Sequence, residues 1–396
     1  MSMDQEAMVT MHEADRYPPA LRHGAWGLLL AWLVLLAGCA ALEPTPVESE
    51  RDGQRQAGLA IQAVYDAALP ELPPAKRRHY AQRLYRITGE ARYVPPNRAY
   101  GHRLVARLEA DIAGLAAPGY VAKRSHEIVL DYPQRTEKQR ARRALLAEWG
   151  EIPFARRLLF RLVQAEYHGL LPAVAGHERA LDYLAGVDWA RFLTDPAVLR
   201  VYAAQVANYV HFLHQLGVAD LREPVVAAFR RQYPPGSAAG LDDLEYRNYL
   251  YGMTHFVIAA SRYYQRRVTA ETVDWVLQTF AREFEAIRAR ATEDIQAEVA
   301  LSFLLAGRDD HPVVARLREA LVAAIDPASG IIPSPEGSTD LVDGEHRNVL
   351  AIMVLRWPGR LHPGPRLDYP MPDGAVSAAS FSARDSWGAS VCWMCR

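Results

Sequence analysis

Lysine and net charge are both scarce in this chain of 396 residues. Lysine and arginine together number 45, yet the only lysines are Lys76, Lys123 and Lys138. We interpret the arginine excess as a consequence of genome composition and not of a special arginine chemistry. The 46 acidic residues leave a formal net charge of −1 at pH 7. This balance gives no electrostatic reason to expect nucleic acid as a partner.

Cysteine is also rare, with three residues in the whole chain. Cys392 and Cys395 lie in the sequence CWMC at the C-terminus. A thioredoxin-like pair would open a helix within a βαβ unit, and a zinc site would need about four ligands. Neither context is present, so we expect a disulfide or an irregular tail here and not a functional site.

The motifs of several common chemistries are missing. The sequence has no Gly-rich phosphate loop, no Gly-x-Ser-x-Gly nucleophile motif and no His-Glu-x-x-His zinc motif. It also lacks the acid-rich clusters typical of diphosphate-ionising terpene cyclases. We therefore expect no cofactor and no metal, with a zinc site made by His255, Glu298 and His346 as the alternative.

The apolar run WGLLLAWLVLLA, residues 26–37, is short for a membrane span and typical of a signal-peptide core. It leads into the sequence LAGC, which resembles a bacterial lipobox. The resemblance implies that Cys39 carries lipid and becomes the mature N-terminus, and Ala40 resembles the pattern of outer-membrane sorting. A plain membrane anchor is the alternative, and Met11 is an alternative start. We expect a lipid-anchored envelope protein on the periplasmic face of the outer membrane.

Composition and periodicity divide the chain into four segments. Residues 1–38 are the predicted lipoprotein signal peptide, and residues 39–53 are the lipid anchor and a polar linker. Residues 54–357 show helical periodicity with almost no alternating β-type pattern. Residues 358–396 are rich in Pro, Gly and Ser, which indicates a wrap or a loose tail.

Two kinds of helix alternate in the predicted helical domain. The segment at 269–287 carries its apolar residues on one stripe, as a surface-lying helix does. The segments at 249–260, 297–307 and 348–357 are apolar around almost the whole circumference, which a soluble protein allows only where a helix is covered on all sides. We expect these segments to form an inner layer.

The predicted inner helices recur at intervals of roughly 50 residues, beginning near 196, 244, 292 and 344. This period is typical of stacked helical hairpins, in an open solenoid or a closed ring. Closure is favoured because an open solenoid would expose helices that are too apolar for a surface. The N-terminal half fits less cleanly, with helices expected near 55–69, 75–88, 97–116, 134–149 and 151–169.

Several phrases carry a resemblance to known proteins. The segment HYAQRLYRITGEARY, residues 79–93, resembles a phrase of α/α-toroid enzymes that act on sugars. YGMTHFVIAAS, EVALSFLL and EHRNVLAIMVLRW resemble an uncharacterised family of proteobacterial lipoproteins of that fold. The resemblance covers roughly residues 60–357 and implies an all-α toroid of inner and outer helices around a cavity. It implies no reaction, because toroids host several chemistries.

One phrase occurs twice, as DLEYRNYL at 243–250 and DGEHRNVL at 343–350. Asp243 and Asp343 suit helix N-caps, and the glutamates two residues later suit the positive end of the helix dipole. Capping does not explain the Arg-Asn pair that follows in each copy. The arginines either pair with acids at the rim of the ring or bind a ligand.

Polar residues at helical spacing form stripes on the predicted inner helices. Asn248, Tyr251 and His255 share one helix face, and Asp294 and Glu298 share a face of the next inner helix. We expect such stripes to converge on one pocket. The candidate catalytic residues are Tyr251, His255, Glu298 and His346, and the candidate ligand-binding residues are Asn248, Asp294, Glu345, Arg347 and Asn348.

Two functions remain open. In the first, the cavity of an envelope protein binds a polar or saccharide ligand. In the second, the protein is a polysaccharide-processing enzyme. Elimination from a uronate would use Arg347 or an asparagine to neutralise the carboxylate and a tyrosine or histidine as base and acid. Hydrolysis would need two carboxylates about 5 to 10 Å apart, for which Glu298 and Glu345 are the best pair.

Overall fold

The computed structural model describes residues 46–369, and these residues contain no β-strand. The predicted signal peptide, Cys39, Cys392 and Cys395 fall outside the described residues. No helix in the described part of the chain is both long and apolar enough to cross a lipid bilayer. Internal contacts divide the chain after Arg51, and the description below concerns the unit that begins at Asp52.

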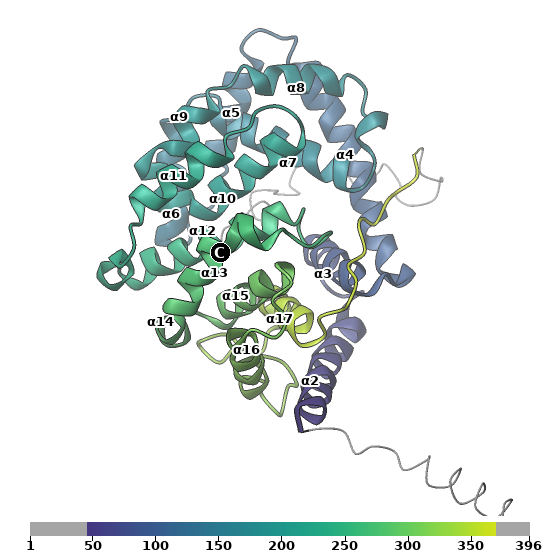
Figure 1. Cartoon of the computed structure of the whole chain (residues 1–396). Coiled ribbons are helices and arrows are strands. Elements are labelled where there is room, and N and C mark those ends of the chain that lie inside the picture. The colour runs from purple at the N-terminus through teal and green to yellow at the C-terminus, as the bar shows by residue number, and fades with distance from the viewer. Residues whose placement is uncertain (1–45, 370–396) are drawn as a thin grey trace, which may run out of the picture. The chain divides into compact units, whose positions relative to one another are not determined.

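Helices make up this unit, most of them joined by short turns, and a longer loop at residues 324–340 joins α16 to α17 (Figure 1). The first of them begins inside the segment that the sequence predicts as a linker. The α-helices are α2 (Pro46–Ala68), α3 (Pro74–Thr88), α4 (Val94–Gly114), α5 (Tyr120–Leu130), α6 (Glu137–Ala147), α7 (Ile152–Tyr167), α8 (His177–Ala185), α9 (Trp189–Thr194), α10 (Pro196–Gln215), α11 (Arg222–Gln232), α12 (Asp243–Ala260), α13 (Ala270–Arg282), α14 (Phe284–Arg290), α15 (Glu293–Leu305), α16 (Pro312–Ala323) and α17 (Leu341–Leu355).

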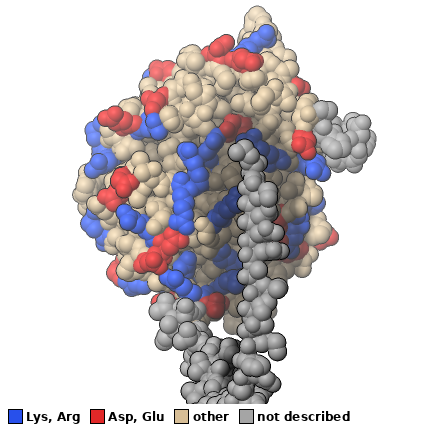
Figure 2. All heavy atoms as spheres, turned by 45° about the vertical axis from the view of Figure 1, so that its right-hand side comes forward, with Lys and Arg blue, Asp and Glu red and all other residues tan. Residues whose placement is uncertain are grey.

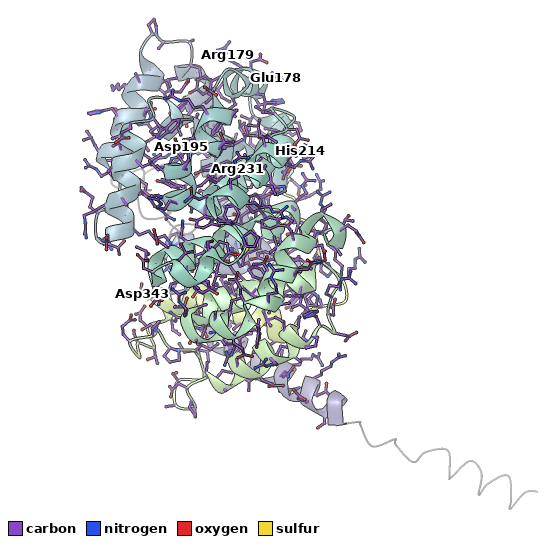
Figure 3. All side chains as sticks on the ribbon, turned by 60° about the vertical axis from the view of Figure 1, so that its left-hand side comes forward. Glu178, Arg179, Asp195, His214, Arg231 and Asp343 are labelled. Carbon is purple, nitrogen blue, oxygen red and sulfur yellow. The ribbon has the colours of Figure 1, made fainter. Side chains whose placement is uncertain are left out.

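The two copies of the repeated phrase begin helices α12 and α17, but with other caps than the sequence predicts. The side chain of Asp242 accepts a hydrogen bond from the backbone N–H of Glu245 at 2.8 Å, and Asp340 accepts one from Asp343 at 2.7 Å. Both caps have the non-helical backbone that the position requires. The prediction that Asp243 and Asp343 are the N-caps is therefore wrong. Asp343 lies exposed in the first turn of α17 (Figure 3).

Burial separates the helices into two kinds, as the sequence predicts. In α15 every residue from Ile295 to Leu305 is buried, so this helix is covered all round. In α13 the buried residues are Val273, Val276, Leu277, Thr279 and Phe280, which lie on one face. The first kind of helix lies inside the core, and the second covers it.

Helix contacts form a continuous series through both halves of the unit. Helix α10 contacts α12, α12 contacts α15, and α15 contacts α17. Helix α17 then contacts α3, which lies beside it in Figure 1. Helices α3 and α4, α4 and α7, and α7 and α10 also contact each other, which returns the series to its start. Residues far apart in the sequence are thereby brought around one shared core.

The described part of the C-terminal segment packs on α3 and on the end of α7. The backbone N–H of His362 donates to the carbonyl of Arg86 at 2.8 Å. Arg86, which is fully buried, donates from Nε to the carbonyl of Gly364 at 3.1 Å. The backbone N–H of Leu367 donates to the carbonyl of His168 at 2.9 Å. Up to residue 369 this segment is therefore a wrap and not a loose tail.

Candidate functional site

A polar pocket of about 1100 Å³, counting the space open to solvent, lies among helices of both halves. Its walls come from α3, α6, α7, α10, α12, α15, α17 and the turn after α12. The lining residues are Arg78, His79, Gln82, Arg83, Lys138, Arg142, Arg156, Arg157, Phe160, Gln164, Ala204, Gln205, Tyr209, Tyr251, His255, Tyr263, Tyr264, Glu298 and His346. We call this space the polar pocket.

The four candidate catalytic residues all line the polar pocket. Tyr251 and His255 come from α12, Glu298 from α15 and His346 from α17. The structure thus brings together residues of three helices that lie far apart in the sequence. Their convergence follows from the contacts of α15 with both α12 and α17.

Glu298 is almost fully buried and contacts three neighbours. Its Oε2 accepts a hydrogen bond from the Thr254 hydroxyl at 2.7 Å. Its Oε1 lies 3.8 Å from Nε2 of His255 and 3.8 Å from Nε2 of His346. Burial, reinforced by the negative charge of Asp294, raises the pKa of Glu298 to about 8. The carboxyl group is therefore mostly protonated at neutral pH and can donate a proton.

His255 is a neutral imidazole whose tautomer is set by its partner. Nδ1 lies 3.0 Å from Oδ1 of Asn208, which is a hydrogen-bond acceptor, so Nδ1 carries the proton. The lone pair of Nε2 then faces Glu298. Burial lowers the pKa of His255 to about 3, which keeps this ring uncharged. A proton donor and a proton acceptor therefore stand side by side in the polar pocket.

The third histidine that lines the polar pocket, His79, is held by a buried carboxylate. Nδ1 of His79 donates to Oε1 of Glu345 at 2.7 Å, and Glu345 is completely buried. The ring of His79 lies beside that of His346, with the two centroids 5.4 Å apart. Glu345, predicted as a ligand-binding residue, is thus not a lining residue but orients one.

The other predicted ligand-binding residues also lie outside the pocket lining. Asp294 accepts a hydrogen bond from the Tyr251 hydroxyl and so lies behind a lining residue. The Asn248 amide donates to the backbone carbonyl of Arg200 on the neighbouring α10. Both side chains therefore support the wall of the polar pocket.

The Arg-Asn pair of α17 holds a loop in place. Oδ1 of Asn348 accepts from the backbone N–H of Ile332 at 2.8 Å, and its Nδ2 donates to the carbonyl of Ile332 at 3.0 Å. Arg347 reaches the same carbonyl at 3.5 Å and lies 3.9 Å from Glu293. This placement is compatible with pairing between Arg347 and an acid of the neighbouring helix α15, and ligand binding by Arg347 stays a prediction.

Cationic side chains of α3, α6 and α7 also line the polar pocket, and none of them is among the site residues predicted from the sequence. They are Arg78, Arg83, Lys138, Arg142, Arg156 and Arg157. A signal was present, because Arg156, Phe160 and Gln164 repeat at helical spacing on α7.

Two tyrosines of the lining sit on a strained turn. Arg262, Tyr263 and Tyr264 follow α12 with φ values of 56°, 58° and 68°, the left-handed region that non-glycine residues avoid. The backbone N–H of Tyr264 donates to the hydroxyl of Ser261 at 2.8 Å, which holds the turn. Strain of this kind gathers at functional sites. The turn presents both rings to the polar pocket.

Within residues 46–369 no group of three or more His, Cys, Asp or Glu side chains is arranged to hold a metal ion. In the alternative zinc site, Oε1 of Glu298 lies 3.8 Å from Nε2 of His255 and 3.8 Å from Nε2 of His346, and these three side chains do not form such a group. Glu298 and the two histidines that face it thus line a pocket that is also lined by cationic side chains of α3, α6 and α7.

Comparison with known protein families identifies the family of the chain. Residues 54–372 match the model of a domain of unknown function, DUF3541. The chain belongs to the DUF3541 family. The matched range contains every residue that lines the polar pocket of this DUF3541 domain. No curated protein and no solved structure gives a significant match.

Proposed function

We propose that this DUF3541 protein is a lipid-anchored protein of the bacterial envelope whose polar pocket binds a saccharide. In this proposal the helical hairpins close into an α/α toroid, and the polar pocket is its cavity. The circular series of helix contacts supports closure, because α17 meets α3 and completes the series. The LAGC sequence after a short apolar run supports the lipid anchor.

The observation that carries the binding function is the composition of the pocket lining. Tyr209, Tyr251, Tyr263 and Tyr264 offer ring faces and hydroxyls, and Gln82, Gln164 and Gln205 offer amides. Aromatic faces with a few placed polar groups suit a ligand that has apolar C–H faces and many hydroxyls. Gln164 is buried, and its Oε1 has no hydrogen-bond partner among the described residues. A ligand hydroxyl would supply one.

The test is a titration of oligosaccharides into two glutamine variants. Gln164→Leu removes the amide from the polar pocket at nearly constant volume, whereas Gln278→Leu makes the same change on the exposed face of α13. Isothermal titration calorimetry should show weaker saccharide binding for Gln164→Leu and unchanged binding for Gln278→Leu. Equal affinities for both variants and the wild type would place the ligand elsewhere.

A second candidate, a polysaccharide-processing enzyme, rests on the proton donor Glu298 beside the base His255. Hydrolysis is the weaker form of this idea, because its expected second carboxylate, Glu345, lies behind His79. Elimination needs only a base and an acid. His255 would take the C5 proton of a uronate as the C4=C5 bond forms, and Glu298 would protonate the departing C4 oxygen. Release of an unsaturated, ultraviolet-absorbing product from polygalacturonate would demonstrate this activity, and intact polymer would exclude it for that substrate.

A further inference from the structure

The charge of the polar pocket is strongly one-sided. Five arginines and one lysine line it, against a single carboxyl group, Glu298, among the described lining residues. That carboxyl group is mostly uncharged at neutral pH, for the reasons given above. The whole chain, in contrast, has a formal net charge of −1. Positive charge is therefore concentrated in the polar pocket, and Figure 2 shows Lys and Arg gathered in the middle of one face of the molecule.

Three of these cations, Arg83 on α3 and Arg156 and Arg157 on α7, form what we call the arginine cluster. Arg83 and Arg156 are 7% and 3% exposed, and Arg157 is half-buried. The Nε atoms of all three donate no hydrogen bond within the described residues. A buried guanidinium N–H without an acceptor carries an energetic penalty that a bound anion would remove.

Two members of the arginine cluster, Arg83 and Arg156, lie beside aromatic rings. The guanidinium of Arg83 lies 5.8 Å from the ring centroid of Tyr264, and that of Arg156 lies 5.9 Å from the centroid of Tyr132. Such stacking fixes a guanidinium without cancelling its charge. Arg156 makes one long contact with a neutral partner, from Nη1 to the Tyr209 hydroxyl at 3.4 Å.

Neighbouring arginines of α7 repel one another, and the lowered pKa of Arg157 reflects this repulsion. Burial, followed by the charge of Arg156 and then of Arg161, lowers the pKa of Arg157 to about 9. Arg161, one turn further along α7, is in a different situation, because it forms an ion pair with Asp111. Among the ion pairs of the described residues, Arg161 therefore has a carboxylate in direct contact and Arg157 has none, although the charge of Asp111 also acts on Arg157.

We propose that the arginine cluster binds an anionic group of the saccharide, either a carboxylate or a sulfate ester. This inference rests on the proposed saccharide binding and specifies the class of its ligand. Guanidinium groups bind both kinds of oxyanion through paired N–H donors. The protonated carboxyl of Glu298 adds no negative charge that would repel such a ligand.

The test uses the full chain and two matched pairs of oligosaccharides. The first pair is trigalacturonate and its methyl ester, and the second is a sulfated κ-carrageenan oligosaccharide and the same oligosaccharide after chemical desulfation. Each is titrated into the wild type, Arg157→Gln and Arg161→Gln. We expect either trigalacturonate or the sulfated oligosaccharide to bind at least tenfold more tightly than its neutral counterpart. The pair that shows this difference identifies the anionic group as a carboxylate or a sulfate ester. Arg157→Gln should lose about tenfold of that affinity, and Arg161→Gln less than twofold.

The stability of the two variants separates a site residue from a structural one. Arg157→Gln should keep or raise the melting temperature, because it removes an uncompensated charge, whereas Arg161→Gln should lower it by breaking an ion pair. If Arg157→Gln does not fold, Arg83→Gln replaces it in the same titration and should show the same loss of affinity. Equal binding of acidic and neutral sugars would overturn the anion site and leave saccharide binding intact. Failure of all four sugars to bind would overturn both.

Discussion

The carboxyl group of Glu298 lies where its ionised form is poorly tolerated. It is 2% exposed, and one hydroxyl, that of Thr254, hydrogen-bonds to it. Burial and Asp294 raise the pKa of Glu298 to about 8, although the positive charges of Arg83 and Lys138 act in the opposite direction. A carboxyl group held neutral at pH 7 can donate a proton or a hydrogen bond, as general acids do. It also makes the stability of the protein depend on pH.

We predict that Glu298→Gln removes a pH-dependent loss of stability. In the unfolded chain Glu298 loses its proton near pH 4.5, and in the folded protein it keeps the proton up to about pH 8. The stability that it contributes is therefore present below pH 4.5 and is lost as the pH rises to 8. The free energy of unfolding of Glu298→Gln, relative to the wild type, should rise by roughly 2–5 kcal/mol between pH 5 and pH 8.

The measurement is denaturant unfolding of both proteins at several pH values. The other groups facing Glu298 are His255, His346, Asp294, Arg83 and Lys138. They are the same in the two proteins, so the difference between the curves isolates Glu298. A constant difference from pH 5 to pH 8 would show that its pKa is not raised.

At the scale of single residues, the sequence predicts the polar stripes but not their partners. Tyr251 and His255 reach the polar pocket, whereas Asn248 on the same helix turns to a backbone carbonyl of α10. Residues three and four apart share a helix face, but that face is wide enough to contact two different neighbours. Which neighbour a given side chain meets depends on helix packing, which one sequence does not specify.

The left-handed turn at Arg262–Tyr264 lowers the stability of the fold and fixes the positions of two tyrosine rings. Each residue in this conformation costs roughly 1–2 kcal/mol relative to the right-handed form. The turn persists because the Ser261 hydroxyl accepts from the N–H of Tyr264 and because Arg86 donates to the carbonyl of Tyr263 at 2.6 Å. Both holding groups are buried, so the rings of Tyr263 and Tyr264 have fixed positions in the polar pocket.

We predict that Ser261→Ala lowers the free energy of unfolding by about 1–3 kcal/mol, because a buried N–H loses its acceptor. Saccharide affinity should fall as well, since the tyrosine rings are released. The control is Ser302→Ala on α15, where the hydroxyl of an equally buried serine only donates to the carbonyl of Glu298 at 2.8 Å. Thermal unfolding and calorimetric titration give both quantities. Equal losses of stability and of saccharide affinity in the two variants would show that the turn does not depend on the Ser261 hydroxyl.

At the scale of helices, the sequence predicts α12, α15 and α17 well and α3 and α7 incompletely. The all-round apolarity of α15 is a local signal, and burial in the structure matches it. The arginines of α3 and α7 carry no such signal, because charged residues on a partly apolar helix are usually predicted to face solvent. Their shared pocket arises only when α17 meets α3, a contact between opposite ends of the domain.

For the molecule as a whole, the proposed location depends on Cys39, which precedes the described residues. We predict that Cys39→Ser abolishes lipid attachment and leaves an unprocessed precursor, because the lipid is carried by that thiol. Metabolic labelling with a radioactive fatty acid and immunoblotting of membrane fractions measure both effects. Cys392→Ser, which alters a cysteine outside the LAGC sequence, should be lipidated normally. Undiminished labelling of Cys39→Ser would remove the lipoprotein assignment.

The central claim is that the polar pocket is where a saccharide binds. Its most direct test is a crystal structure of the protein with the tightest-binding oligosaccharide of the two matched pairs. We predict a sugar within hydrogen-bond distance of Glu298, with its acidic group on Arg83 or Arg157. A sugar bound only on the outer surface of the helices, with the polar pocket occupied by water alone, would contradict the account.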